Sequence, residues 1–272
     1  MKIAGVVVLY NPDKDCINNI KTYVDKVNKL YIVDNSDVTI NYIWDKNREI
    51  DSVEYISLGQ NKGLAYALNI AVKKAIEEKY DWLLTMDQDS KFLNDIIGIY
   101  KRYIKNNDCS SVALLSPQYE TERNTPVNNY DVDEVYWTMQ SANLINLSLV
   151  EPLRMFEEKY FIDCIDYEYC LKAKKAGYNI LRINEAVLKH SPAVNKKIGR
   201  LNYGYTSPLR VYYQTRNAMD MWKRYHSFRA LGIVIVKFGK SVLLFDNKRK
   251  YVKAIFQGIT DCNHNKFGKK EL

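Results

Sequence analysis

The sequence predicts an α/β fold in which a mostly parallel sheet has helices on both faces and a helical extension follows at the C-terminus. Up to residue 116, short apolar runs alternate with amphipathic segments, which is typical of parallel sheets. Beyond residue 205 the patterns are helical. The chain has 272 residues, of which 47% are hydrophobic, so one large domain with an appendage can bury a substantial core. We expect a sheet domain at residues 1–204 and a basic helical region at residues 205–272.

The first 116 residues contain five segments with the length and composition of buried strands. The predicted strands span residues 2–9, 30–33, 53–58, 82–86 and 111–115, and the predicted helices between them span residues 14–28, 64–75 and 93–105. Right-handed crossovers bring the carboxyl ends of such parallel strands to one edge of the sheet. Ligands usually bind at that edge, so the loops after these strands are the first place to look for a site.

The rest of the chain mixes strands, loops and helices. We expect a polar, mobile loop at residues 117–134, a strand at 135–145, a helix from about Ile165 to Gly177, a strand at 179–183 and a flexible segment at 193–206. Helices are then predicted from Pro208, at residues 231–245 and near residues 251–260.

Two carboxylates one residue apart follow the fourth predicted strand. Asp87 and Asp89 would repel each other unless a cation or a proton neutralises the site. Mg²⁺ typically binds one or two carboxylates and completes its shell with water and phosphate oxygens, so this loop is predicted to be a metal and diphosphate site. The alternative is a solvated turn rich in aspartate. His190 follows a later strand and is either a further ligand of the same cation or a structural histidine.

Three other loops at the predicted edge could contact a nucleotide. Tyr10-Asn11-Pro12-Asp13 follows the first strand. Asp34 ends the second strand, and it could accept a hydrogen bond from a base N–H or a ribose hydroxyl, or form an Asx turn. The loop Gly59-Gln60-Asn61-Lys62-Gly63 could let the backbone approach a nucleotide, although it lacks the P-loop and dinucleotide-binding glycine patterns.

A second group of acids begins the helix predicted near residue 165. Asp163, Asp166 and Glu168 lie at or near its first turn, where the helix dipole by itself favours negative charge. If this helix end faces the Asp87 loop, one of the carboxylates could instead take a proton from an attacking hydroxyl. Both interpretations stay open at this point.

Charge is distributed unevenly along the chain. Residues 1–188 hold 22 basic and 28 acidic residues, whereas residues 189–272 hold 18 basic and 4 acidic residues. The basic third could face nucleic acid, anionic lipid or a phosphate-bearing substrate. Its apolar helices bordered by lysines suit an interfacial helix on an anionic membrane, or helices that pack on the main domain with solvated lysines.

The cysteines and the N-terminus indicate a cytoplasmic protein. Five scattered cysteines with no close pair predict neither a disulfide framework nor a zinc site, so reduced thiols are expected. The first apolar run enters Asn11-Pro12 without a cleavage pattern and is better explained as a strand than as a signal peptide. No run approaches the roughly 20 apolar residues that span a bilayer.

Taken together, these segments resemble family 2 glycosyltransferases of the GT-A fold, and within them the bacterial rhamnosyltransferase-type branch. The resemblance covers most of the chain. It is carried by Val8-Leu9-Tyr10-Asn11-Pro12, Val33-Asp34-Asn35-Ser36, residues 61–69, Asp87-Gln88-Asp89-Ser90, residues 161–170 and residues 212–217.

The resemblance implies roles for individual residues. The nucleotide-sugar site would comprise Tyr10, Asn11, Pro12, Asp34, Asn35, Asn61, Lys62, Gly63, Asp87 and Gln88, and a Mg²⁺ or Mn²⁺ ion would bind at Asp87 and Asp89. In the family's helix motif, Asp166 takes the position of the catalytic base and Glu168 takes the position of the second acid. Because Ile165 stands where many members carry Glu, Asp163 is the fallback base. Arg216 or Lys62 could add positive charge at the diphosphate, unless these side chains are simply solvated.

The resemblance also implies the reaction. We expect an inverting transferase that moves a sugar, rhamnose in this branch, from a dTDP- or UDP-sugar to a saccharide or lipid-linked saccharide of a bacterial surface polysaccharide. Two departures matter: Ser141-Ala142-Asn143 replaces a Ser-Gly pair on the acceptor side, and residues 214–217 match the Gln-x-x-Arg-Trp element of processive members only loosely. A single-addition enzyme, peripheral at the inner face of the membrane, is therefore expected.

Two other functions are compatible with parts of the sequence. A metal-dependent nucleotidyltransferase would usually need a basic, glycine-rich loop after the first strand, which Tyr10-Asn11-Pro12-Asp13 is not. A nucleic-acid-binding protein could use the basic and aromatic C-terminal third, but it would leave both acidic groups unexplained. No nucleic acid partner is therefore expected.

Overall fold

A nine-stranded sheet forms the centre of the computed structural model, which describes residues 1–38, 52–122, 124–127, 129–190, 195–198 and 201–270. Its order is β3-β2-β1-β4-β8-β6-β9-β5, and β7 pairs with β9. The strands are β1 Ile3–Leu9, β2 Lys29–Asp34, β3 Val53–Ser57, β4 Trp82–Asp87, β5 Ser90–Phe92, β6 Val112–Glu120, β7 Val132–Glu134, β8 Asn143–Asn146 and β9 Asn179–His190. Strands β1 to β4 are parallel, as are β6 and β9, whereas β5, β7 and β8 pair antiparallel. The predicted α/β fold with a mostly parallel sheet is confirmed.

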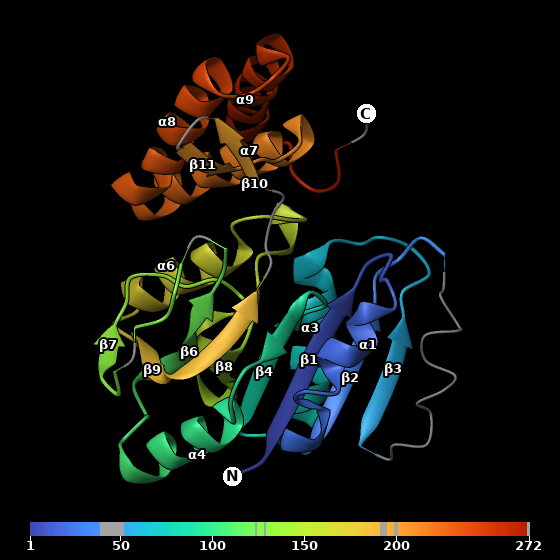
Figure 1. Ribbon diagram of the computed structural model, residues 1–272, viewed down its shortest axis with the longest axis vertical. Helices are drawn as coiled ribbons and strands as arrows, with labels where there is room; N and C mark the ends of the chain where they lie inside the picture. Colours follow the sequence, from blue (N-terminus) through green and yellow to red (C-terminus); the bar gives the residue numbers. More distant parts are fainter. Residues whose placement is uncertain (39–51, 123, 128, 191–194, 199–200, 271–272) are drawn as a thin grey trace.

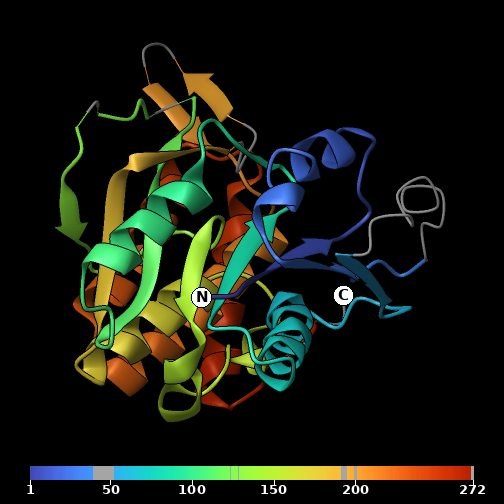
Figure 2. The same ribbon diagram turned by 90° about the horizontal axis from the view of Figure 1, so that it is seen from below.

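Helices cover both faces of the sheet because its central strands are apolar at nearly every position. In β1, Val6 faces the core that contains α3 (Leu64–Glu77), and Val7 faces the core that contains α4 (Ile96–Asn106). Successive side chains of a strand point to opposite faces, so a continuous apolar run needs cover on both sides. Figure 2 shows α1 (Asp15–Ile20) and α4 on one side of the sheet and α3 on the other.

The helix predicted at residues 14–28 is shorter than expected. Helix α1 ends at Ile20, and a 3₁₀ turn, η1, follows at Val24–Lys26. Tyr23 is fully buried and packs against Phe92 with a ring separation of 5.4 Å. The backbone φ of Tyr23, −139°, lies outside the helical range, so a continuous helix cannot pass through this residue.

The polar loop predicted at residues 117–134 is partly strand. Strand β6 continues to Glu120, and β7 occupies the end of the segment. Pro117 lies at a register shift between Ser116 and Gln118, where the ladder with β9 is interrupted. A proline, which lacks an N–H, is tolerated at such an irregularity.

The strand predicted at residues 135–145 begins only at Asn143. Residues 135–142 have no regular structure and cross the end of β4, where the Ala142 N–H donates to the Thr85 carbonyl at 2.7 Å. Ala142 has a φ of +60°, a left-handed conformation that a strand cannot contain. The correction matters because this crossing segment reaches the site described below.

The C-terminal third forms a helical layer beyond the carboxyl ends of the parallel strands (Figure 1). Besides those named above, the helices are α5 Val150–Leu153, α6 Ile165–Lys175, α7 Pro208–Tyr225, α8 Phe228–Leu243 and α9 Lys248–Asn263, with 3₁₀ turns η2 Leu147–Leu149 and η3 Glu158–Tyr160. The helices predicted near these positions are confirmed. None of the described helices is both long enough and apolar enough to cross a bilayer.

The segment predicted to be flexible, residues 193–206, contains a hairpin. Strands β10 (Asn195–Ile198) and β11 (Leu201–Gly204) pair antiparallel. Eight positions of this segment therefore have regular backbone pairing, which the sequence did not predict. Residues 193–194 and 199–200 lie outside the described ranges.

Candidate active site

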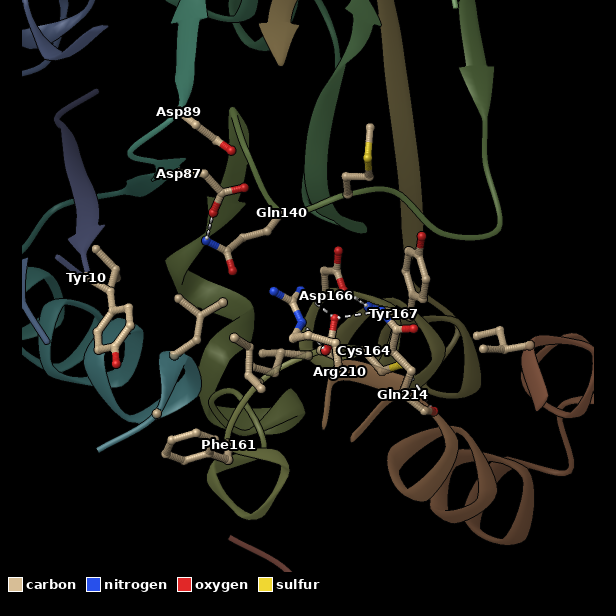
Figure 3. Close-up of a pocket in the computed structure, with 18 of the residues that line it drawn as sticks. Tyr10, Asp87, Asp89, Gln140, Phe161, Cys164, Asp166, Tyr167, Arg210 and Gln214 are labelled. Atoms are coloured by element: carbon tan, nitrogen blue, oxygen red, sulfur yellow. Dashed lines mark hydrogen bonds and ion pairs between the residues drawn. The ribbon is translucent and has the colours of Figure 1, made fainter. Parts of the chain in front are cut away.

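A cleft of about 700 Å³ is bounded by the carboxyl ends of the parallel strands on one side and by the C-terminal helices on the other (Figure 3). Its walls come from the loops after β1, β2 and β4, from the start of α6, and from α7 and α8. The predicted site residues that line it are Tyr10, Asn35, Asn61, Gly63, Asp87, Gln88, Asp89, Asp163, Asp166 and His190. Residues 1–204 and 205–272 thus both contribute to one cleft.

Asp87, Asp89 and His190 form a compact group on one wall. Their ligand atoms all lie within 4.8 Å of one another, and His190 Nδ1 is 3.3 Å from the Asp89 carboxylate. Two carboxylates and an imidazole are donors that can hold a divalent metal ion. The residues predicted to bind metal therefore have a geometry and a chemistry that fit such an ion.

Strand β5, which was not predicted, brings His190 to the aspartates. Ser90 pairs with His190 in the register of β5 and β9, and its Oγ lies 2.7 Å from His190 Nδ1. Burial lowers the pKa of His190, but the hydrogen bond to Asp89 and the charges of Asp87 and Asp89 outweigh burial and leave the pKa raised. A three-residue strand is too short to show the alternation by which strands are recognised.

The crossing segment before β8 holds Asp87 in place. Gln140 Nε2 donates to the Asp87 carboxylate at 3.0 Å, and the Asp87 N–H donates to Ser141 Oγ at 3.1 Å. Burial raises the pKa of Asp87 to about 6, while His190 opposes this shift and Asp89 adds to it. Gln140 was missed in the sequence because the segment was interpreted as a strand.

Asp166 lies across the cleft from this group, in the first turn of α6 (Figure 3). Its carboxylate accepts the N–H of Tyr167 at 2.9 Å. Burial raises the pKa of Asp166 to about 7; the Tyr167 N–H opposes the shift, and the charges of Asp87 and Asp163 add to it. A carboxylate with a pKa near neutrality can accept a proton efficiently at physiological pH.

Asp163, the fallback base, is paired with a cation. Arg210 donates to both of its oxygens, through Nε at 2.6 Å and Nη2 at 2.7 Å, and Gln214 Nε2 donates at 3.1 Å. A carboxylate held in this bidentate way is less available to an incoming hydroxyl than Asp166. Arg210 and Lys237 of α8 line this side of the cleft, and neither residue was predicted to belong to the site.

The structure does not bring Glu168 to the cleft, contrary to the predicted catalytic role. Its side chain is fully buried and accepts hydrogen bonds from the Tyr225 hydroxyl and from Lys172 Nζ, the latter at 3.4 Å. Arg224 Nη2 lies 3.2 Å from the same carboxylate. Two residues along a helix turn the side chain about 200°, so Glu168 and Asp166 face opposite directions.

Arg216 is also placed away from the cleft, which corrects its predicted contact with a diphosphate. Only 1% of the residue is exposed, and its guanidinium donates to the carbonyls of Gly268 at 3.0 Å and Tyr160 at 3.2 Å. It therefore joins α7 to the C-terminal segment and to the loop before α6. Arg210, on the same helix, is the arginine that lines the cleft.

Replacing Arg216 by methionine should lower the free energy of unfolding by about 2–4 kcal/mol, because buried carbonyls lose their charged donor. Urea unfolding measures the loss. Arg102→Met is the matched control: Arg102 is 56% exposed in its ion pair with Glu185, so its loss should cost under about 1 kcal/mol. A stable Arg216→Met protein that no longer binds a nucleotide sugar would restore Arg216 to the site.

The predicted nucleotide loops divide into residues that line the cleft and residues that support it. Asn35 Oδ1 accepts the Lys62 N–H at 2.8 Å, and Asn35 Nδ2 donates to Asn61 Oδ1 at 3.1 Å, which ties two loops together. Gln88, in the loop after β4, contacts the loop after β1, since its Oε1 accepts the Tyr10 N–H at 2.8 Å. The Asn11 N–H also donates to Ser36 Oγ at 2.9 Å, so the loops after β1 and β2 and the loop at residues 59–63 are joined.

Besides Arg216, four predicted nucleotide-binding residues, Asn11, Pro12, Asp34 and Lys62, are absent from the described lining of the cleft. Asp34 is 2% exposed, and its carboxylate accepts the Tyr55 hydroxyl and, at 3.0 Å, the Ser36 N–H. The Asx turn that the sequence left as an alternative is therefore formed. The Lys62 ammonium lies 5.1 Å from the centre of the Tyr66 ring.

Comparisons with known proteins agree with this geometry. Residues 13–163 match the sequence model of "Glycosyl transferase family 2", which is more than half of the chain. The chain is 25% identical over 272 residues to dTDP-rhamnosyl transferase RfbF of Shigella flexneri, covering 92% of each protein. It is 21% identical over 297 residues to the low-salt glycan biosynthesis hexosyltransferase Agl10 of Haloferax volcanii, covering 98% of this chain and 92% of the relative.

Solved structures of two glycosyltransferases share the fold. GalNAc-T7, crystallised with UDP, GalNAc and Mn²⁺, superposes with a TM-score of 0.64 at 10% identity; the match covers 97% of this chain and about half, 56%, of that one. Residues 1–349 of S. aureus TarS give a TM-score of 0.56 at 16% identity, covering 98% and 83%. These likenesses confirm the predicted GT-A fold. The match across residues 13–163 shows that the chain belongs to glycosyl transferase family 2.

Proposed function

We propose that this glycosyltransferase moves rhamnose from dTDP-rhamnose to a saccharide acceptor, with inversion at the anomeric carbon, in bacterial surface polysaccharide biosynthesis. One observation carries the proposal: the Asp87, Asp89 and His190 group and the carboxylate of Asp166 line the same cleft. The name of the Shigella relative supports the choice of donor.

The two sides of the cleft suit two parts of such a reaction: activation of the acceptor hydroxyl at Asp166, and departure of the diphosphate at Asp87, Asp89 and His190. Asp166 would take the proton of the acceptor hydroxyl as its oxygen attacks the anomeric carbon, and the bond from that carbon to the diphosphate breaks. A Mn²⁺ or Mg²⁺ ion on Asp87, Asp89 and His190 would neutralise the charge of the leaving nucleoside diphosphate. Tyr10, Asn35 and Asn61 line the cleft where the nucleotide would lie, and Arg210 replaces Arg216 as the arginine of the site.

The rate should depend on the ionisation of Asp166. Because the pKa of Asp166 is about 7 without a bound cation and a base must be ionised, kcat/KM should fall about tenfold per pH unit below an inflection at or below about pH 7 and stay level above it. A cation bound near Asp87 stabilises the carboxylate and moves the inflection lower. The dependence of kcat/KM on pH at saturating Mn²⁺ measures this inflection. If kcat/KM stays level down to about pH 5, the base is a carboxyl group with an ordinary pKa and not Asp166.

Donor choice can be tested by thermal shift with dTDP-rhamnose, UDP-glucose and UDP-N-acetylglucosamine, each with and without Mn²⁺ or Mg²⁺. A donor at 100 times its Kd should add about 2.7 kcal/mol of stability. We expect dTDP-rhamnose with a metal ion to raise Tm more than either alone. A larger rise in Tm with a UDP-sugar would show that the UDP-sugar, and not dTDP-rhamnose, is the donor. The anomeric configuration of the product, measured by NMR, tests whether the transfer inverts.

A further inference from the structure

Helix α8 exposes apolar side chains to solvent, the reverse of an ordinary surface helix. Its exposed large hydrophobic residues are Phe228 at 81%, Ile235 at 64%, Val236 at 54%, Phe238 at 44%, Val242 at 37% and Leu243 at 74%. Its buried side carries the small or medium residues Ala230, Val234 and Ser241. The hydrophobic content of α8 is therefore not explained by packing on the rest of the chain.

One stripe of this helix is uncharged along its whole length. Phe228, Gly232, Ile235, Gly239 and Val242 follow one another at spacings of four and three residues, which places them on one face. A Cβ added to either glycine would meet no described atom within 4 Å. The stripe is therefore open to a partner along four turns.

The surroundings of the stripe are basic. Between residues 228 and 260 the sequence has seven basic residues and one acidic residue. Lys248, Arg249, Lys250 and Lys253 are exposed on the first turns of α9, which packs against α8. An apolar face bordered by lysine and arginine is the pattern of helices that lie in the interface of anionic membranes. A two-fold contact with a second copy would instead bring these like charges together.

Helix α8 also borders the cleft. Gly232 of the stripe lines it together with Ile233, Val236 and Lys237, so the stripe meets the cleft at Gly232. Figure 1 shows α8 and α9 at the end of the molecule beyond the carboxyl ends of the strands. A surface that binds α8 would consequently lie beside the mouth of the cleft.

We propose that α8 docks the protein on an anionic lipid bilayer. Its stripe lies among the lipid headgroups, and the basic residues of α9 face the anionic lipids. The cleft then opens beside the membrane surface, where a lipid-linked acceptor would be presented. That last point rests on the proposed function, whereas the docking itself does not.

Sedimentation of the full chain with vesicles tests the proposal without donor or acceptor. We expect binding to vesicles of about 30% phosphatidylglycerol in phosphatidylcholine, weakened by high salt, and at least about tenfold weaker binding to phosphatidylcholine alone. Ile235→Ser with Val242→Ser should lower the affinity for anionic vesicles at least about tenfold. Neither residue lines the cleft, so thermal shift by the nucleotide sugar should be unchanged.

The matched control is Ile76→Ser with Leu93→Ser, which removes two side chains exposed at 44% and 45% elsewhere on the surface. This protein should bind vesicles as the wild type does, and circular dichroism confirms that both variants are folded. Equal vesicle binding by wild type and the α8 variant would overturn the proposal. So would a wild-type dimer, seen by light scattering, that the α8 substitutions convert to monomer, because the stripe would then belong to a second copy.

Discussion

Replacing Asp166 by asparagine should lower kcat about 10²- to 10⁴-fold, the contribution of a positioned general base. The substitution keeps the size of the side chain and its acceptor for the Tyr167 N–H, but the amide cannot take a proton. KM for the donor should change little, because the base acts on the acceptor. Release of the nucleoside diphosphate in the presence of acceptor measures the effect.

The same substitution should make the protein more stable at pH 8. The pKa of Asp166 in the folded state, about 7, lies above its ordinary value of 3.8. The neutral form of the Asp166 carboxyl group is the one that burial favours. The folding free energy that depends on it is fully present below pH 3.8 and is lost as the pH rises through about 7. Asparagine stays neutral, so Asp166→Asn should raise the free energy of unfolding by on the order of 1–2 kcal/mol at pH 8 and leave it unchanged near pH 3. This figure allows for the partial exposure of the side chain.

Asp163→Asn is the control for both effects. Its carboxylate is held by Arg210 and Gln214, so its loss should reduce kcat by at most about tenfold through disturbed positioning. If Asp163→Asn instead shows the larger loss and Asp166→Asn turns over normally, the base is Asp163.

Replacing Asp89 by asparagine should lower kcat/KM about 10³-fold, because a bound cation supplies several kcal/mol of charge stabilisation to the transition state. The rise in Tm on adding Mn²⁺ should disappear as well. The fold should be unaffected, since the Asp89 side chain is 46% exposed. Activity at several Mn²⁺ concentrations and thermal shift measure the two effects.

Asp25→Asn is the matched surface control for this experiment. Its side chain is 64% exposed and pairs only locally with Lys26, so both activity and the Mn²⁺ response should equal those of the wild type. An Asp89→Asn protein that keeps the full Mn²⁺-induced rise in Tm would remove Asp89 from the metal site.

Buried elements were predicted well because their patterns are local. Strands β1, β2 and β4 are buried apolar runs of ordinary length, α3 begins and ends within two residues of the predicted bounds, and α7 begins at the predicted Pro208. Parallel order then places the ends of β1, β2 and β4 at one edge, which is why Tyr10, Asn35 and Asp87 could be expected together. These predictions needed only residue periodicity and the handedness of crossovers.

Several contacts in the site could not be predicted in this way, because they join distant segments. Ser90 and His190 are 100 residues apart and meet only through the pairing of β5 with β9. Gln140 reaches Asp87 because residues 135–142 leave the strand conformation. Neither contact has a pattern in the neighbouring sequence.

The sequence by itself determined the order of the long strands and helices, the two acidic groups and the family resemblance, because each is encoded in short segments. Only the tertiary structure decided which charged groups face the cleft. Asp166 and Arg210 line it, whereas Glu168, in the same helix as Asp166, and Arg216, in the same helix as Arg210, are buried. The direction of a side chain around a helix has meaning only once the packing of that helix is fixed, and packing is a property of the whole chain.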